Sequence, residues 1–427
     1  MPVSRRQFIK LGAGMVTVGV IAPTTLLREA RAQSPIGNRK LVIINLEGGN
    51  DGLNTVIPYT DSEYHKLRPA LGFKEGDLKT PAGQSTIISN QFGLHPAMGE
   101  IKAFYDQGKV AIVQGVGYRD SSLSHFLSAD IWQSADTSGL SRTGWLGRYA
   151  DLALINQPGL PAASFNYESP RTFHSRQVVI PNILNFDLYN FLTDPAYPDD
   201  YTNQFRAFYA AASRTFPGES LVGAVNRTAL ASVEGAQRVQ AGVASYQSSV
   251  IYPEENPLAS GLKMVAQVLT TLPEAYLTYA QMGGFDNHSD QILHPDGNPD
   301  KREGDHARLL GWFSEAVKVF YDDMAEHGLA DQVVMMQYSE FGRRPEENAS
   351  FGTDHGTSNV MFVIGNPVRG GLYGTQPSLA AADLDDGGNP KFHVDFREVY
   401  ATILEGWLNF DSREVLGAKY DNVGFFG

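Results

Sequence analysis

The chain has 427 residues, no cysteine and a formal net charge of −13, with 42% hydrophobic and 19% charged residues. This length is enough for one large α/β domain or two ordinary domains, and the hydrophobic share is enough to bury a core. The lack of cysteine excludes disulfides, thiolate metal ligands and a thiol nucleophile, so a metal would need histidine and oxygen ligands. The acidic balance disfavours binding to nucleic acid, which requires a basic surface.

Residues 1–32 have the pattern of an export signal. The pair Arg5-Arg6 precedes a short, moderately hydrophobic run, and Ala30-Arg31-Ala32 supplies small residues at a cleavage position. The arginine pair resembles the signal that the twin-arginine export machinery reads on folded proteins. Pro23 and several glycines interrupt the run, so we expect cleavage rather than a permanent membrane span. The mature protein is therefore expected to be periplasmic or secreted.

The next elements in chain order alternate between strand and helix. The continuous apolar run at 41–46 predicts a buried strand that leads into a glycine-rich polar loop. Helical spacing of apolar residues follows at 96–108, and a second strand is predicted at 110–113. A short helix is predicted at 126–132, directly after a serine-rich loop.

The segment from about 151 to 257 differs in composition, being rich in Asn, Tyr, Pro and Ser and then in Ala, Val and Gln. We interpret it as a cap-like insertion, with one long helix at 219–246, into a single domain spanning 33–427. Alternation resumes after it, which predicts a mostly parallel sheet with helices on both faces. The remaining predicted elements are strands at 275–280, 333–336 and 360–364 and helices at 305–327 and 396–408.

Polar residues gather where the predicted strands end. Because the carboxyl ends of parallel strands meet at one sheet edge, these residues are candidates for a common site. Carboxylates and histidines on separate loops match the ligands of one or two divalent ions such as zinc or manganese. Two ions would clamp a phosphate- or sulfate-like group. The groups are Asn50-Asp51, Asp120 to His125, Asp286-Asn287-His288 and Asp354-His355-Gly356, with Glu340 and Arg343 before the last and His393 after it.

Each of these groups also has a purely structural interpretation. Asn50-Asp51-Gly52 is an ordinary turn pattern, and an Asp–His pair can be an interior hydrogen-bonded pair. Ser124 precedes a predicted helix, where unpaired N–H groups stabilise an alkoxide and a bound oxyanion. Serine is equally common there as a helix cap, and Ser121 or Ser122 are alternative nucleophiles.

Several longer motifs resemble the exported bacterial family known as domain of unknown function 1501, which resembles the alkaline phosphatase and sulfatase superfamily. The resemblance covers nearly the whole mature chain. The motifs are Asn45 to Pro58, Ser124-His125-Phe126 with Asp130 and Trp132, Gly283 to His288, Glu340 to Arg343, Gly352 to Gly356, and Asp395-Phe396-Arg397 with Tyr400 and Trp407.

The resemblance implies an alkaline-phosphatase-like three-layer α/β sandwich and assigns roles to single residues. The chain departs from the family at Asn287, where the family has Thr, and from the superfamily in the short spacing between Asp286 and His288. The implied nucleophile is Ser124, and the implied metal ligands are Asp51, Asp286, His288, Asp354, His355 and His393.

Two functions fit these patterns. The first is an exported metal-dependent hydrolase of phosphate or sulfate esters, in which Ser124 attacks in line and Arg343 binds the substrate's charge. The second is a non-catalytic exported protein that binds a surface polymer or a protein partner. The surface for such a partner would be the tyrosine-rich insertion with Tyr167, Tyr189, Tyr197, Tyr201 and Tyr209.

Overall fold

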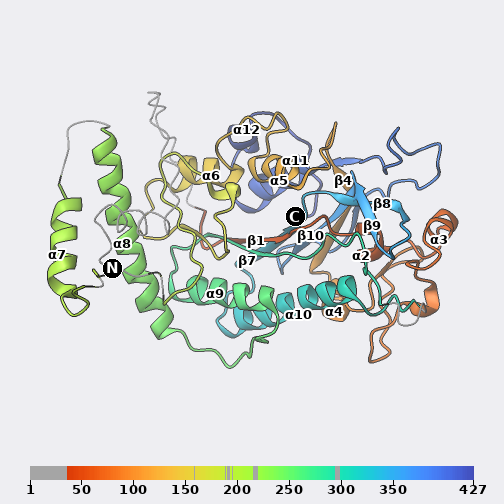
Figure 1. Ribbon diagram of the computed structural model, residues 1–427, viewed down its shortest axis with the longest axis horizontal. Helices are drawn as coiled ribbons and strands as arrows, with labels where there is room; N and C mark the ends of the chain where they lie inside the picture. The colour runs from red at the N-terminus through yellow and green to blue at the C-terminus, as the bar shows by residue number, and fades with distance from the viewer. Residues whose placement is uncertain are drawn as a thin grey trace.

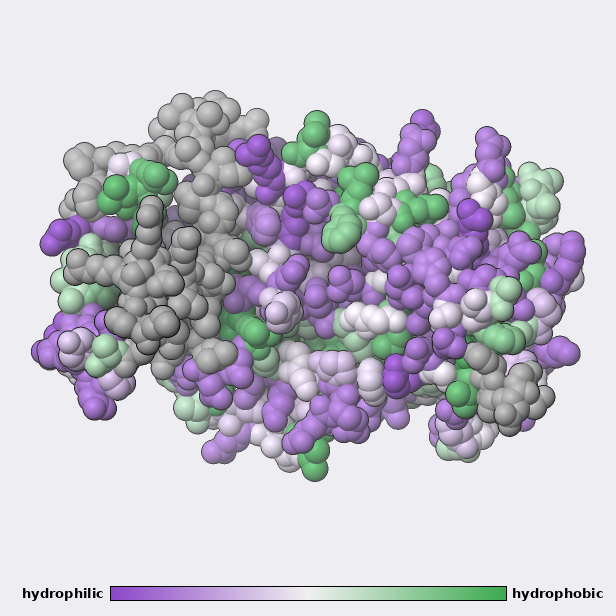
Figure 2. Space-filling model, viewed as in Figure 1, coloured by the Kyte–Doolittle hydropathy of each residue, from purple (hydrophilic) through white to green (hydrophobic). Residues whose placement is uncertain are grey.

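The computed structural model describes residues 36–157, 159–187, 189, 193–194, 196–214, 220–293 and 299–427. The predicted export signal at 1–32 lies outside the described residues. Within the described part of the chain, no helix combines the length and the apolar character needed to cross a membrane. The face shown in Figure 2 is mostly hydrophilic, with hydrophobic side chains in small, separate groups.

A central sheet organises the molecule, with strand order β11-β4-β10-β7-β1-β6-β5 and with β12 paired to β4. Every pairing in it is parallel except those of β10, which runs antiparallel to both β4 and β7. The predicted, mostly parallel sheet is therefore confirmed. Its strands are β1 (Lys40–Leu46), β4 (Val110–Gly117), β5 (Ala162–Ser164), β6 (Leu277–Met282), β7 (Val333–Tyr338), β10 (Asn359–Ile364), β11 (Gly371–Gly374) and β12 (Val394–Asp395).

Helices cover both faces of this sheet, so the predicted three-layer α/β sandwich is also confirmed (Figure 1). Alternate residues of β1 point to opposite faces: Val42 and Ile44 join one hydrophobic core, and Leu41 and Ile43 join the other. One face carries α4 (Gly99–Asp106), α9 (Pro257–Thr271) and α10 (Asp305–Glu326). The other carries α5 (His125–Ser134), α6 (Trp145–Tyr149), α11 (Phe396–Thr402) and α12 (Ser412–Leu416).

Short elements surround the carboxyl ends of the strands, at the right of Figure 1. The β8–β9 hairpin was not predicted, because its strands are polar and lack a run of apolar residues. It pairs Arg343 directly with His355. These elements are α2 (Gly52–Thr55), β2 (Val56–Ile57), α3 (Ser62–Leu67), β3 (Gly93–Leu94), β8 (Gly342–Glu347) and β9 (Thr353–Gly356).

The segment predicted as an insertion is only partly separate from the sheet. Its strand β5 pairs in parallel with β6 and forms one edge of the central sheet. Helices α7 (Tyr201–Ala212) and α8 (Leu221–Ser245) lie at the opposite end of the molecule from β8 and β9 (Figure 1). The long helix predicted at 219–246 is confirmed as α8 over its described residues, and α8 packs against α9.

Candidate metal centre

One loop, one short strand and one helix start bring polar side chains together at the carboxyl edge of the sheet. Asp286 and His288 lie on the loop after β6, and His355 lies on β9. His125 is the first residue of α5, which follows β4. Because β1, β6 and β7 run parallel, the segments that follow them leave the sheet on the same side.

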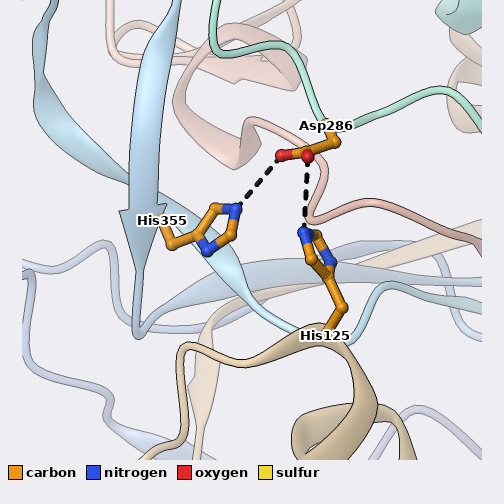
Figure 3. Close-up of side chains that lie close together, drawn as sticks. All are labelled: His125, Asp286 and His355. Carbon is orange, nitrogen blue, oxygen red and sulfur yellow. Dashed lines mark hydrogen bonds and ion pairs between the residues drawn. The ribbon is translucent and has the colours of Figure 1, made fainter.

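The carboxylate of Asp286 lies at the centre of this cluster. Figure 3 shows it between the rings of His355 and His125. Its Oδ1 is 3.1 Å from Nε2 of His288 and 3.1 Å from Nε2 of His355, and its Oδ2 is 3.4 Å from Nε2 of His125. The Nε2 atoms of His288 and His355 are themselves only 2.9 Å apart. The ligand atoms of His125, Asp286 and His355 lie within 4.8 Å of one another and therefore face a common point, and Nε2 of His288 lies beside it.

Each of the three rings is held from behind through its other nitrogen. Nδ1 of His125 lies 2.8 Å from Oε1 of Glu340, and Nδ1 of His288 lies 3.2 Å from Oδ1 of Asp354. The third ring, that of His355, has Nδ1 2.9 Å from the carbonyl oxygen of Leu123. All three partners are acceptors, so they favour a proton on Nδ1. In a neutral ring Nε2 then has a lone pair, whereas a hydrogen bond from Nε2 of His355 to Asp286 requires a ring that carries both protons.

This arrangement leaves lone pairs pointing at one another. Two unprotonated nitrogens 2.9 Å apart repel each other unless a proton or a cation lies between them. Imidazole rings whose second nitrogen is held by a carboxylate or carbonyl are the usual ligands of zinc and related ions. The donor set therefore fits a divalent cation. The Asp286 side chain is 47% exposed, so an ion and a substrate can reach it from solvent.

Arg343 ties the cluster to the surrounding loops. This buried guanidinium donates to Asp286 Oδ1 at 2.8 Å and to the backbone carbonyls of Gly48, Gly49, Phe285 and Thr353. Burial raises the pKa of Asp286, but hydrogen bonds from Arg343 and His355 outweigh this effect and lower the pKa to about 2. Asp286 is therefore ionised at neutral pH, as a metal ligand must be.

The electrostatic surroundings differ between the histidines. The hydrogen bond with Glu340 raises the pKa of His125, and the charges of Glu340 and Asp286 add to this effect. Burial lowers the pKa of His355, although its hydrogen bond with Asp286 acts in the opposite direction. His355 therefore favours the neutral form that coordinates metals. The raised pKa of His125 favours a positively charged ring, and a metal ion at its Nε2 would supply positive charge in place of the proton.

Two glycines allow the loops of the site to cross. A Cβ on Gly48 would lie 2.4 Å from the backbone nitrogen of Asp286, and one on Gly352 would lie 2.3 Å from the carbonyl carbon of His288. Neither position has room for a side chain. The glycine-rich segments that stood out in the sequence therefore bring backbone close to backbone behind the ligands.

With this geometry established, comparison with known proteins assigns a family. The model of a family described as a protein of unknown function (DUF1501) matches residues 38–419. The chain belongs to this family. No curated protein matches it.

Solved structures show only a distant likeness. Ps i-CgsB, solved in complex with k-i-k-neocarrahexaose, is 11% identical, with 90% of this chain and 73% of that chain covered and a TM-score of 0.40. The PsFucS1 sulfatase from Pseudoalteromonas sp. is 11% identical, with 91% and 73% covered and a TM-score of 0.37. A protein in the alkaline phosphatase superfamily from Vibrio parahaemolyticus is 11% identical, with 88% and 71% covered and a TM-score of 0.32. Such values carry no argument about activity.

The structure brings together only part of the ligand set that the family resemblance implied. Asp286, His288 and His355 lie in the cluster as described above. Asp354 lies behind it, where its Oδ1 contacts Nδ1 of His288 and not the common point. His393 is exposed beside β4, where its backbone N–H donates to the carbonyl of Gly115.

Asp51 has different partners altogether. It follows β1 as expected, but it is buried, and its carboxylate accepts hydrogen bonds from Arg68 and Gln291. The loop that follows β1 therefore approaches the cluster through its glycines, Gly48 and Gly49, and not through Asp51.

The three candidate serines occupy different environments. Ser124 is exposed at the N-cap position of α5, and its side chain makes no capping hydrogen bond. The Oγ of Ser122 accepts from the backbone N–H of Ser124, and the Oγ of Ser121 is buried without a partner in the described part of the chain. Ser124 is thus the most accessible of the three and directly precedes His125.

Sequence reasoning placed His125 and Glu340 near the site but gave neither a role. The signal was available, because both residues lie in groups that follow strands. The predicted role in the first group went to Ser124, the neighbour of His125. Glu340 was not expected to orient a histidine, because no histidine lies near it in the sequence. Their pairing joins positions 215 residues apart, which no local pattern reveals.

Proposed function

We propose that the protein is an exported hydrolase that uses a divalent metal ion, zinc or manganese, to cleave phosphate or sulfate esters. The observation that carries this proposal is the convergence of three imidazole Nε2 atoms on the Asp286 carboxylate, with every Nδ1 held by an acceptor. A bound divalent ion supplies Lewis acidity, which polarises an ester oxygen and stabilises negative charge in the transition state.

Each residue of the cluster has a distinct role in this proposal. His125, His288, His355 and Asp286 hold the ion. Glu340 and Asp354 orient two of the rings and increase their basicity, as carboxylates behind metal-bound histidines do. The buried contacts of Arg343 favour a positioning role, so we replace the predicted role of binding the substrate's charge. Arg343 sets the position of Asp286 relative to the loop that follows β1.

Ser124 is the proposed nucleophile. It is exposed, lies at the start of a ten-residue helix, and neighbours a proposed metal ligand. The helix N-terminus places unpaired N–H groups and positive dipole next to its Oγ, which favours an alkoxide and a bound oxyanion. In-line attack by Oγ on the phosphorus or sulfur forms a covalent enzyme ester and breaks the bond to the leaving alkoxide, which becomes the alcohol by taking up the proton that Ser124 loses. Water then cleaves the enzyme ester.

The remaining parts of the proposal concern place and partners. The export signal at 1–32 supports delivery to the periplasm or beyond by the twin-arginine export machinery, with the mature domain beginning at residue 33. The substrate is a small anionic ester or an anionic group on a surface polymer. The exposed cluster suits both, because substituents of the ester can extend into solvent.

Metal analysis combined with an ester screen tests the proposal. Purified protein is expected to bind zinc or manganese, and Asp286→Asn and His355→Ala are expected to weaken binding by about 10- to 100-fold or more. His393→Ala is the matched control, because it removes an exposed histidine outside the cluster. A protein that binds no divalent ion, or loses it only in His393→Ala, would contradict the proposal.

The nucleophile is tested separately with p-nitrophenyl phosphate, p-nitrophenyl sulfate and bis(p-nitrophenyl) phosphate. Ser124→Ala is expected to keep the metal and to lower kcat by about 10³-fold or more, as loss of a nucleophile does. Full activity in Ser124→Ala would reject the covalent step and leave metal-dependent hydrolysis by water. Absence of turnover with every ester in the metal-loaded wild type would favour the second candidate function.

That second candidate is a non-catalytic exported protein that binds a surface polymer or protein partner. The observation that favours it is the exposure of insertion tyrosines, with Tyr167 82% and Tyr197 67% exposed. Aromatic rings with a polar edge suit such contacts. Polymer binding that is lost in Tyr167→Ala, together with an inactive metal-loaded protein, would support this function over hydrolysis.

A further inference from the structure

The Asp51 carboxylate lies at the same edge of the sheet as the metal centre, but both of its oxygens already accept hydrogen bonds. Its Oδ2 accepts from Nη1 of Arg68 at 2.6 Å and from Nε2 of Gln291 at 2.6 Å. Its Oδ1 accepts from Nη2 of Arg68 at 3.0 Å. The side chains of Asp51 and Arg68 are 2% and 0% exposed, so this two-point ion pair is shielded from water. A bidentate pair of this kind is the strongest way to hold a carboxylate with a side chain.

The hydrogen-bond donors of Arg68 are all satisfied as well. Arg68 caps the C-terminal end of α3, and its remaining N–H groups donate to acceptors on two other segments. Nε donates to the carbonyl of Pro345, Nη1 to Oδ1 of Asn54, and Nη2 to the carbonyl of Arg344. All five N–H donors of the guanidinium therefore have an acceptor. An ion entering beside Asp51 would separate the buried charge of Arg68 from the carboxylate with which it is paired, which is strongly unfavourable.

The groups around this pair are donors rather than ligands. Gln291 presents its amide N–H₂ to Asp51 because its Oε1 accepts from Thr353. The nearby His306 has its Nε2 3.0 Å from Oδ1 of Asn50. Burial also lowers the pKa of His306 to about 4, so this histidine is neutral at pH 7 and adds no positive charge near Asp51. Arg68 thus supplies the single positive charge that balances Asp51.

We propose that the metal centre holds one divalent ion, and that the Arg68 guanidinium takes the place of a second cation at Asp51. This inference rests on the proposed function, because it concerns the stoichiometry of the same centre. It replaces the expectation that Asp51 is a metal ligand. The single ion lies at His125, Asp286 and His355, the only group of metal-ligating side chains found together in the described part of the chain, with Nε2 of His288 next to Asp286 and His355.

Loading of the full chain with Mn²⁺ tests the inference without any activity measurement. Metal content by mass spectrometry is expected to be one ion per chain, and the electron paramagnetic resonance spectrum is expected to be that of an isolated Mn²⁺ ion. Two ions per chain with an exchange-coupled spectrum would overturn the inference but leave the proposed function standing. A chain that binds no ion would overturn both.

A matched pair of isosteric variants locates the ion. Asp51→Asn is expected to keep one Mn²⁺ per chain and the isolated-ion spectrum, while its melting temperature falls because Arg68 loses its charged partner. Asp286→Asn is expected to lose Mn²⁺ affinity by about 10-fold or more with a smaller change in melting temperature. Loss of one ion in Asp51→Asn would overturn the inference. If Asp51→Asn does not fold, the wild-type stoichiometry and spectrum decide alone.

Discussion

Two buried histidines beneath the site predict a steep loss of stability in acid. His95 and His306 are 1% and 2% exposed, and their rings lie 5.8 Å apart, edge to face. Burial lowers the pKa of His95 to about 3 and that of His306 to about 4, from 6.5. Both rings are therefore neutral in the folded protein at every pH at which an ordinary histidine gains its proton.

The sign of the effect follows from this difference. Below pH 6.5 these two histidines bind protons in the unfolded chain but not in the folded protein. The free energy of unfolding therefore falls as the pH falls. Each histidine contributes about 1.4 kcal/mol per pH unit, and over two units the pair removes about 5 kcal/mol. A loss of this size equals the whole stability of many domains, which is about 5–15 kcal/mol.

The buried carboxyl group of Asp51 does not produce the same slope in this range. Burial raises the pKa of Asp51, but Arg68 more than reverses this and lowers it below 3.8. Its contribution is therefore present above the unfolded pKa and is lost only as the pH falls below it. The slope between pH 6.5 and pH 4.5 thus isolates the two histidines from this carboxyl group.

Urea unfolding at a series of pH values, with chelator present to remove metal linkage, measures the slope. His306→Gln keeps a donor for Asn50 but cannot titrate, so the slope is expected to fall by about 1.4 kcal/mol per pH unit. His393→Gln serves as the control variant, because that histidine is exposed and lies outside the buried pair. A free energy of unfolding that stays constant from pH 7 to pH 4.5 would refute the reasoning, as would an unchanged slope in His306→Gln.

The remaining predictions concern residues that support the centre. Glu340→Gln removes the charge behind His125 and is expected to weaken metal binding by about 10- to 100-fold in calorimetry, with an unchanged affinity counting against the orienting role. Gly352→Ala places a Cβ against the backbone of His288 and is expected to lower the free energy of unfolding by about 1–3 kcal/mol in urea. Arg343→Lys keeps the charge but loses the planar fork, so metal affinity is expected to fall, whereas wild-type affinity would show that charge alone suffices.

The fold was largely predictable because most strands of the sheet are buried on both faces. Such strands appear in the sequence as continuous apolar runs, and β1, β4, β7 and β10 all follow this pattern. The antiparallel direction of β10 was not predictable, since it depends on the hairpin β8–β9 that precedes it. That hairpin is polar because it covers the centre instead of filling the core.

The candidate site was predictable in part, and the limit is the direction of side chains. The rule that functional residues follow parallel strands located Asp286, His288 and His355. It placed Asp51 in the same group, because nothing in the sequence shows that Arg68, 17 residues later, turns back to pair with it. Spacing reports which loop carries a carboxylate, whereas hydrogen bonds with distant segments decide where its oxygens point.

The proposed ligands come from three distant segments, and two of them, the loop after β6 and β9, are joined through Arg343 rather than through an ion. Arg343 donates to carbonyls on the loop after β1, on the loop after β6 and on β9, and these bonds are buried. Since these hydrogen bonds do not involve an ion, the segments are expected to stay together in the metal-free protein, and metal binding is not the folding event. Chelation is therefore expected to leave the near-ultraviolet circular dichroism intact. It is expected to lower the free energy of unfolding only by the contribution of metal binding, which is about 4 kcal/mol at a free metal concentration of 1,000 times Kd. Loss of tertiary structure on chelation would show instead that the ion, and not Arg343, holds these segments together.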